Sequence, residues 1–137
     1  MARVLVVDDD PRIAMMVSER LRALGIDTDT ASNGRDALVR LCAATAEGAP
    51  YDVAIVDIVM PGIDGWQVLK AIKHNPLWSS TSVVVVSGYA SSTEDLLRII
   101  EFDGVYVEKR AGFLETVGEI VQRVIADSDA RRQRETD

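Results

Sequence analysis

Several features that would direct attention to other classes of protein are scarce in this chain of 137 residues. The single cysteine, Cys42, excludes an internal disulfide, and we expect it to be a small buried side chain on a helix. Lys and Arg number 15 against 22 Asp and Glu, and the net charge of -7 argues against a direct nucleic-acid surface. No apolar run reaches the roughly 18 residues of a membrane span, and no signal peptide precedes the first apolar run. We therefore expect a cytoplasmic protein that contacts neither nucleic acid nor membrane.

Two kinds of ligand site are also missing from the sequence. A structural zinc ion is held by four cysteine or histidine ligands, and this chain has only one cysteine and one histidine. The histidine, His74, lies at a predicted helix end. Neither Gly-x-Gly-x-x-Gly nor Gly-x-x-x-x-Gly-Lys-Ser/Thr follows the first apolar run, which argues against a Rossmann or P-loop nucleotide site.

Short apolar runs alternate with helical patterns five times along the chain. The predicted strands cover 3–7, 28–31, 53–56, 83–86 and 105–107. This alternation predicts an α/β fold, a doubly wound parallel sheet with helices on both faces. A Ser91–Glu94 capping box is expected to open the fourth helix, and the last helix is expected over 112–126. We place one domain at 1–126 and interpret the charged segment 127–137 as a tail or the start of a linker.

Carboxylates follow two of the predicted strands. Asp8, Asp9 and Asp10 come directly after the first, and Asp57 comes directly after the third. In open α/β sheets, ligands bind at the carboxyl ends of the strands. Each close pair of carboxylates there costs on the order of 4 kcal/mol at an effective dielectric of about 20. Mg²⁺ relieves such repulsion and prefers oxygen ligands, so the pattern indicates an Mg²⁺ site at which one carboxylate accepts a phosphoryl group.

Two further predicted strand ends supply groups that suit the same chemistry. Ser87 follows the fourth strand, and its hydroxyl is able to donate to a phosphoryl oxygen. Lys109 follows the fifth strand, and its ammonium pairs with carboxylate or phosphoryl oxygens.

These residues resemble the receiver domain of two-component response regulators, a CheY-like family. Val-Leu-Val-Val-Asp-Asp-Asp-Pro is similar to the opening motif of the family, and Asp-Ile-Val-Met-Pro-Gly-Ile-Asp-Gly is similar to its phosphoacceptor motif. The resemblance covers the chain from Val4 to about Val124. It implies a flavodoxin-like sheet of five strands in the order 2-1-3-4-5, flanked by five helices.

The resemblance also implies roles for individual residues. Asp57 would accept a phosphoryl group from a sensor kinase histidine or a phosphotransfer protein. Asp8 and Asp9 would hold Mg²⁺ together with Asp57 and the backbone carbonyl of Val59. The remaining implied contacts to the phosphoryl group come from Ser87 and Lys109.

Tyr106 would be an aromatic switch that turns inward when Ser87 moves. The signal would then pass through the face formed by the fourth helix, the fifth strand and the fifth helix. That face would bind a downstream target or output domain, or a second copy of the chain in a homodimer.

One departure from the family falls on that output side. Arg110 stands where the family usually has a proline after the lysine. A receiver-like interaction domain that works without phosphorylation is therefore the alternative reading.

A true phosphatase with an aspartyl nucleophile is disfavoured, because Asp57-Ile58-Val59 lacks a second acid two residues after the nucleophile. We expect a phosphoacceptor with slow self-dephosphorylation rather than a conventional enzyme.

Overall fold

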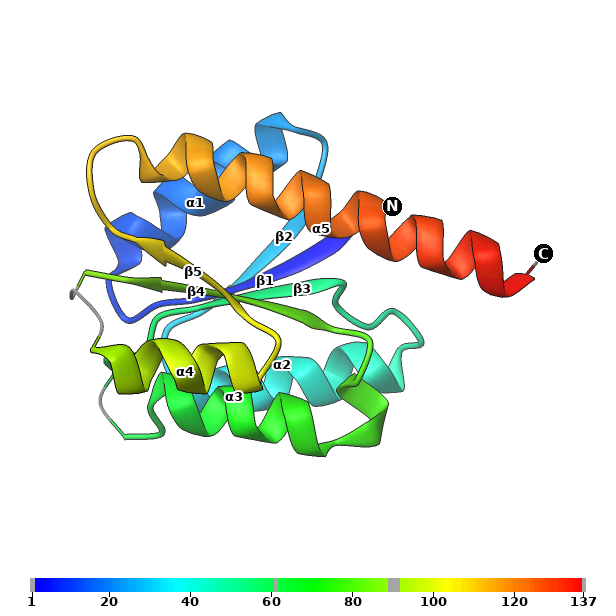
Figure 1. Cartoon of the computed structure of the whole chain (residues 1–137), viewed down its shortest axis with the longest axis horizontal. Coiled ribbons are helices and arrows are strands. Elements are labelled where there is room, and N and C mark those ends of the chain that lie inside the picture. The colour runs from blue at the N-terminus through cyan, green and yellow to red at the C-terminus, as the bar shows by residue number, and fades with distance from the viewer. Residues whose placement is uncertain (1, 61, 89–91, 137) are drawn as a thin grey trace.

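The computed structural model describes residues 2–60, 62–88 and 92–136 and contains one parallel sheet of five strands (Figure 1). The strands are β1 (Arg3–Val7), β2 (Asp27–Ala31), β3 (Val53–Val56), β4 (Ser82–Ser87) and β5 (Val105–Glu108). Their order across the sheet is β2-β1-β3-β4-β5, and every neighbouring pair is parallel. The predicted fold class and strand order are both confirmed.

Five α-helices and one short 3-10 helix connect the strands. They are α1 (Pro11–Ala23), α2 (Gly34–Ala46), α3 (Gly65–His74), η1 (Pro76–Trp78), α4 (Thr93–Glu101) and α5 (Phe113–Thr136). Helices α1 and α5 cover one face of the sheet, and α2, α3 and α4 cover the other (Figure 1). Each face therefore has its own hydrophobic core.

The three inner strands β1, β3 and β4 carry no polar alternation because both faces of the sheet are covered there. In β1, Val4 and Val6 join the core under α1 and α5, whereas Leu5 and Val7 join the core under α2 and α3. All four side chains are at most 1% exposed. A strand such as β1, which is covered by helices on both faces, therefore needs an uninterrupted run of apolar residues.

Cys42 is exposed, so the prediction of a buried thiol is wrong. The buried positions of α2 are Gly34, Ala37, Leu41 and Ala44, which recur at three- and four-residue steps. Cys42 follows Leu41 directly, and successive residues of an α-helix are rotated by about 100° from one another. Its side chain therefore lies off the buried face.

The start of α4 also differs from the prediction. Ser91 lies outside the described residues, and the observed N-cap is Ser92, whose side chain accepts a hydrogen bond from Asp95 N at 3.2 Å. The Ser-Ser pair allows either residue to cap a helix, so sequence alone did not decide between them.

The last helix continues to Thr136 and does not end at Ala126 as predicted. Figure 1 shows this segment extending beyond the sheet. Arg132 Nη2 lies 2.8 Å from Asp52 Oδ1, and the other carboxylate oxygen of Asp52 accepts a hydrogen bond from Arg3 N. The charged segment is therefore helical and is held to the amino end of the sheet. Assigning 127–137 to a tail or linker stays a prediction.

Among the described residues, no helix combines the length and hydrophobicity that a membrane crossing requires.

A polar network joins the edge strand to the middle of the sheet. Asp29 Oδ2 accepts hydrogen bonds from Tyr51 Oη at 2.6 Å and from Arg3 Nη2 at 2.9 Å. The Arg3 guanidinium also lies over the Tyr51 ring, 4.7 Å from its centroid. Burial and the hydrogen bond to Asp29 raise the pKa of Tyr51 to about 12.

We predict that Tyr51→Phe lowers the free energy of unfolding by about 1.5–3 kcal/mol at pH 8, as expected for a lost hydrogen bond to a charged group. The pKa of Tyr51 in the folded protein lies above its ordinary value of 10.0. The folded state therefore holds this proton more tightly, and its contribution is complete below pH 10 and lost as the pH rises through about 12. Urea unfolding at several pH values should show the difference between wild type and variant shrinking over that window. A difference that stays constant there would contradict the prediction.

Candidate functional site

Four of the predicted site residues meet at the carboxyl edge of the sheet. Asp8 follows β1, Asp57 follows β3, Ser87 ends β4 and Lys109 follows β5. The parallel ladder continues past the strands, because Asp8 N donates to Ala31 O at 3.1 Å and Asp57 N donates to Val7 O at 2.9 Å. Lys109 N likewise donates to Ser87 O at 2.8 Å. The backbone of each of these residues is thus fixed by a neighbouring strand.

Lys109 joins the two buried acids. Its Nζ lies 2.7 Å from Asp8 Oδ2 and 3.3 Å from Asp57 Oδ2. The side chains of Asp8 and Asp57 are only 5% and 8% exposed, and that of Lys109 is 16% exposed. This ammonium therefore offsets part of the negative charge at an edge that is largely shielded from water.

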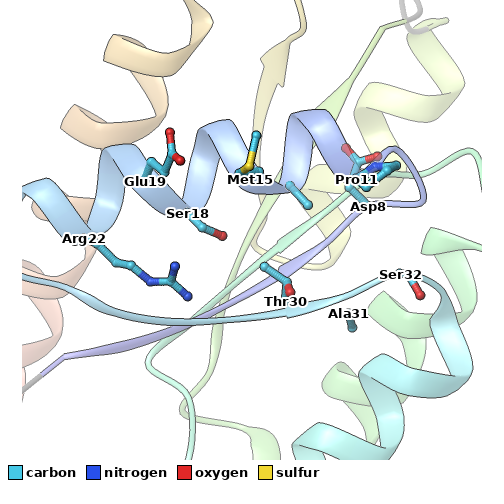
Figure 2. Close-up of a pocket in the computed structure, with 10 residues that line it drawn as sticks. Asp8, Pro11, Met15, Ser18, Glu19, Arg22, Thr30, Ala31 and Ser32 are labelled. Carbon is cyan, nitrogen blue, oxygen red and sulfur yellow. The ribbon is translucent and has the colours of Figure 1, made fainter.

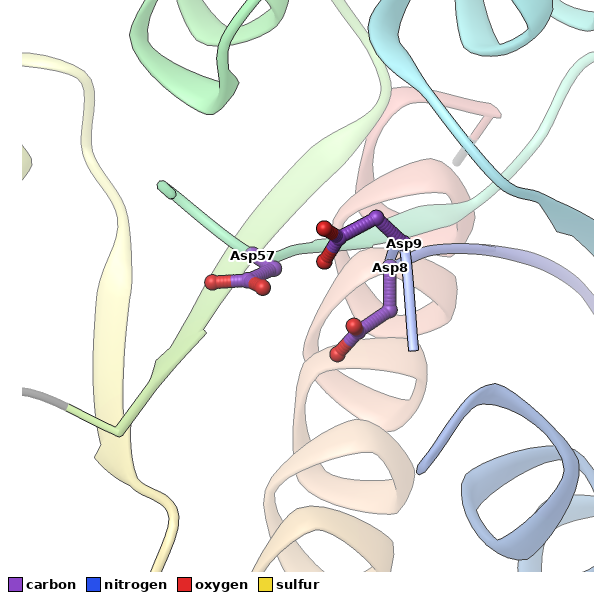
Figure 3. Close-up of side chains that lie close together, drawn as sticks. All are labelled: Asp8, Asp9 and Asp57. Carbon is purple, nitrogen blue, oxygen red and sulfur yellow. The ribbon is translucent and has the colours of Figure 1, made fainter. Parts of the chain in front are cut away.

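A third acid completes a cluster at this edge. Carboxylate oxygens of Asp8, Asp9 and Asp57 all lie within 4.8 Å of one another, and Asp9 is exposed. Figure 3 shows the three side chains together at the ends of β1 and β3. Among the described residues, Asp8, Asp9 and Asp57 form the one group of three acids, histidines or cysteines that lie close enough together to hold a metal ion.

The charges shift the proton equilibria of the site. Burial raises the pKa of Asp57, and the neighbouring charge of Asp8 adds to this, while Lys109 opposes it. Burial alone lowers the pKa of Lys109, but its hydrogen bond to Asp8 and the charges of Asp8 and Asp57 outweigh burial and raise it. The lysine is thus held in its charged form, whereas ionised Asp57 is disfavoured relative to water.

Each buried carboxylate is oriented by the chain that follows it. Asp8 Oδ1 accepts a hydrogen bond from Asp10 N at 2.9 Å, and Asp57 Oδ1 accepts one from Val59 N at 3.2 Å. Val59 itself is exposed in the loop after β3. These turns fix one oxygen of each acid while Lys109 contacts the other.

Gly65 is a determinant of the site that the sequence reading missed. A Cβ at this position would overlap the carbonyl oxygen of Asp57 and the Cα of Ile58. Gly65 N also donates a hydrogen bond to Ile58 O at 3.0 Å. The first turn of α3 therefore packs directly against the loop that carries Asp57. A glycine directly after the cap Asp64, where helix formers are favoured, was the available signal.

Two other predicted residues occupy the β4–β5 side of the site. Ser87 is 3% exposed. Tyr106 is half-buried in β5, pairs in register with Val85 and packs against the core under α2, α3 and α4. Arg110 is exposed, with its Nη1 3.7 Å from Glu108 Oε2. The structure places Ser87 and Tyr106 on adjacent strands, and their switch role stays a prediction.

The sequence matches the family model described as response regulator receiver domain over residues 4–113, and the chain therefore belongs to this family. The sheet order, the paired acids and the lysine at the carboxyl edge agree with that assignment.

Curated relatives cover part of the chain. Transcriptional regulatory protein TcrA of Mycobacterium tuberculosis is 31% identical over 102 residues, which are 74% of this chain and 36% of TcrA. Protein PilG of Pseudomonas aeruginosa is 36% identical over 85 residues, which are 62% of this chain and 59% of PilG. The chain thus spans only about a third of the length of TcrA.

Solved structures match the whole fold. Chemotaxis protein CheY4 of Vibrio cholerae is 31% identical with a TM-score of 0.77, covering 90% of this chain and 98% of that one. Response regulator protein TrrA of Thermotoga maritima, in complex with Mg(2+)-BeF, is 33% identical with a TM-score of 0.75. The match covers 90% of this chain and 99% of the TrrA chain.

We predict that Gly65→Ala lowers the free energy of unfolding by about 1–3 kcal/mol, because its Cβ meets backbone atoms that no side-chain rotation can move aside. Urea denaturation measures this loss. Gly88→Ala is the control, since a Cβ at Gly88 meets no atom within 4 Å and should change stability little. Equal effects of the two substitutions would contradict the close packing described for Gly65.

We further predict that Asp57→Asn raises the free energy of unfolding in the presence of a chelator. The raised pKa means that the folded state binds a proton at Asp57 more tightly than the unfolded chain does. Wild-type stability therefore falls as the pH rises from the ordinary value of 3.8 through the raised pKa, and the advantage of the variant is complete above it. Denaturation at pH 4 and pH 7 tests this, with Asp127→Asn on the exposed end of α5 as the control. A destabilised Asp57→Asn at pH 7 would refute it.

Proposed function

We propose that Asp57 accepts a phosphoryl group from a phosphohistidine of a sensor kinase or phosphotransfer protein. The observation that carries this proposal is the contact of Lys109 Nζ with both Asp8 and Asp57, at 2.7 and 3.3 Å, beside the three-acid cluster. The carboxylate of Asp57 thus lies beside the Lys109 ammonium and the further carboxylate oxygens of Asp8 and Asp9, at the carboxyl edge of the sheet.

The residues present suit Mg²⁺. Three carboxylates face one ammonium, so the site retains an excess of negative charge. Mg²⁺ prefers oxygen ligands, and in proteins these are commonly carboxylates, waters and phosphate oxygens. We assign Asp8, Asp9, Asp57 and the backbone carbonyl of Val59 as its ligands. The bound ion would supply positive charge that offsets the charge of the incoming phosphoryl group.

The transfer itself follows from the groups at the edge. A carboxylate oxygen of Asp57 forms a bond to phosphorus while the bond between phosphorus and the histidine nitrogen breaks, which leaves an acyl phosphate. Lys109 is close enough to exchange its contact with Asp57 for one with a phosphoryl oxygen, and the Ser87 hydroxyl donates to another. Water then hydrolyses the acyl phosphate slowly, so the protein is a phosphoacceptor and not a conventional enzyme.

Signal output is assigned to the face made by α4, β5 and α5. Phosphorylation adds negative charge and acceptor oxygens, which would attract Ser87 and allow Tyr106 to turn inward. Helix α4 suits movement because Ile99 is its one buried residue among those described, while Leu97 and Ile100 are exposed. This face would then bind a protein target, an output domain or a second copy of the chain.

The solved complex of TrrA with Mg(2+)-BeF supports the proposed ion and acceptor chemistry, since TrrA is 33% identical over most of the chain. The second candidate is a receiver-like domain that binds partners without phosphorylation. Arg110, which stands in place of the proline usual in the family, is the observation that favours it.

Incubation with acetyl phosphate, followed by intact mass measurement, tests the proposal. We expect one phosphoryl adduct that requires Mg²⁺ and is absent from Asp57→Asn. Asp127→Asn, an exposed acid on α5, is the matched control and should accept the group as wild type does. If folded wild-type protein forms no adduct and does not bind beryllofluoride with Mg²⁺, the phosphorylation-independent reading replaces this one.

A further inference from the structure

We infer that Gly34, the first residue of α2, is a positioning residue for the loop that follows Asp57 and carries Val59. Gly34 is buried, and it belongs to a helix that bears none of the acids of the site. It has no side chain with which to touch an ion or a phosphoryl group, so it acts through the loop against which it packs. Because the effect is read at the Mg²⁺ site, this inference rests on the proposed function.

Gly34 is in direct contact with Ile63, near the far end of that loop. A Cβ at Gly34 would overlap the carbonyl oxygen of Ile63 and would lie 2.6 Å from its Cγ2 and 2.8 Å from its Cβ. Gly34 does not have a positive φ, and alanine is a better helix former than glycine. Nothing within α2 therefore requires a glycine at this position, and the requirement comes from the neighbouring loop.

Helix α3 holds the same loop from another side. Gly65 lies two residues after Ile63, and a Cβ on it would overlap the carbonyl oxygen of Asp57 and the Cα of Ile58. Its N–H donates a hydrogen bond to Ile58 O at 3.0 Å. The residue between Ile63 and Gly65 is the N-cap of α3, so the connection is short. A displacement of Ile63 would thus press the first turn of α3 against Asp57 or weaken this hydrogen bond.

The start of α2 is a fixed support, because the strand before it is held at the same edge of the sheet. Ala31, the last residue of β2, accepts a hydrogen bond from Asp8 N at 3.1 Å. From α1, Arg22 Nη2 donates to Thr28 O in the same strand at 2.9 Å. Figure 2 shows Arg22 reaching toward β2, and Ser32 where the strand leads into α2. A side chain added to the first turn of α2 would therefore displace the loop rather than the helix.

The carbonyl of Val59 is the assigned Mg²⁺ ligand that depends most on the path of this loop. Asp8 and Asp9 follow β1, and Asp57 directly follows β3, so the sheet places all three acids. Val59 is exposed, and its N–H donates to Asp57 Oδ1 at 3.2 Å. Groups that orient a metal ligand from behind typically contribute about 10–100-fold to metal affinity. A shifted loop should therefore weaken Mg²⁺ binding without removing any carboxylate.

Amide chemical-shift titration of the full chain with Mg²⁺ tests this, with the amides of Asp57 and Val59 as reporters. We expect Gly34→Ala to bind Mg²⁺ at least about tenfold more weakly than wild type, as for other groups that orient a metal ligand. A second readout needs no metal: hydrogen exchange at the Gly65 amide should be faster in Gly34→Ala, because its hydrogen bond to the loop is weakened. Circular dichroism establishes that each variant is folded under the conditions of the titration.

Gly118→Ala is the matched control. Gly118 is buried in α5, on the opposite face of the sheet from α2 and α3 (Figure 1). A Cβ there would lie 3.2 Å from Leu24 Cδ1 and 3.3 Å from Arg20 Nε, both of them side-chain atoms. This variant adds the same methyl group at a crowded helix contact but touches neither the loop nor the acids. Its Mg²⁺ affinity should equal that of wild type.

Ile63→Gly is a second variant that approaches the contact from the loop. It removes the side chain that meets Gly34, so it should also weaken Mg²⁺ binding, and it carries the test alone if Gly34→Ala does not fold. In the Ile63→Gly background, two of the three nearest atoms to the new Cβ are gone. Adding Gly34→Ala there should weaken binding by a smaller factor than it does in wild type, since the two positions are in contact.

The outcomes distinguish this inference from the proposed function. Saturable Mg²⁺ binding by wild type that is equally tight in Gly34→Ala, or in Ile63→Gly, overturns the positioning role alone. An equal loss of affinity in Gly118→Ala overturns it as well, because the effect would then reflect general destabilisation. A wild-type chain without any saturable Mg²⁺ shift would overturn the assigned ion site, and the positioning role with it.

Discussion

Lys109 lies between two largely buried acids that would otherwise repel each other at the carboxyl edge of the sheet, and the electrostatics of the site depend on this contact. The acids end neighbouring strands, so a parallel sheet brings them together regardless of their charge. Burial is the main cause of the raised pKa of Asp57, and the charge of Asp8 adds to it while Lys109 opposes it, so ionised Asp57 is disfavoured. The excess negative charge at this edge is what the proposed divalent cation would offset.

The elements that place this site were predictable from the sequence for physical reasons. Uninterrupted apolar runs such as 4–7 indicated strands buried on both faces, and polar residues directly after them had to meet at one edge of a parallel sheet. The positions of Asp8, Asp57, Ser87 and Lys109 at that edge follow from this. Their individual roles rest on the resemblance to a family and on the experiment proposed above.

Other features depend on tertiary contacts that local patterns do not encode. The helix beyond Ala126 has no apolar stripe, and the ion pair that joins Arg132 to Asp52 links residues 80 apart in the sequence. The exposure of Cys42 follows from a rotation about the axis of α2. The role of Gly65 depends on the close contact between the backbone of α3 and that of the loop after β3.

The bond from Arg22 to Thr28 O also matters for the edge of the sheet. β2 is the outermost strand on its side, and residues of a parallel strand direct their backbone groups alternately toward and away from the neighbour. Asp27 N bonds to Ala2 O toward β1, so Thr28 O faces outward. An outward carbonyl occupied by a charged side chain is a poor template for strand addition. Together with the exposed acid Asp27, this cap disfavours edge-to-edge aggregation through β2.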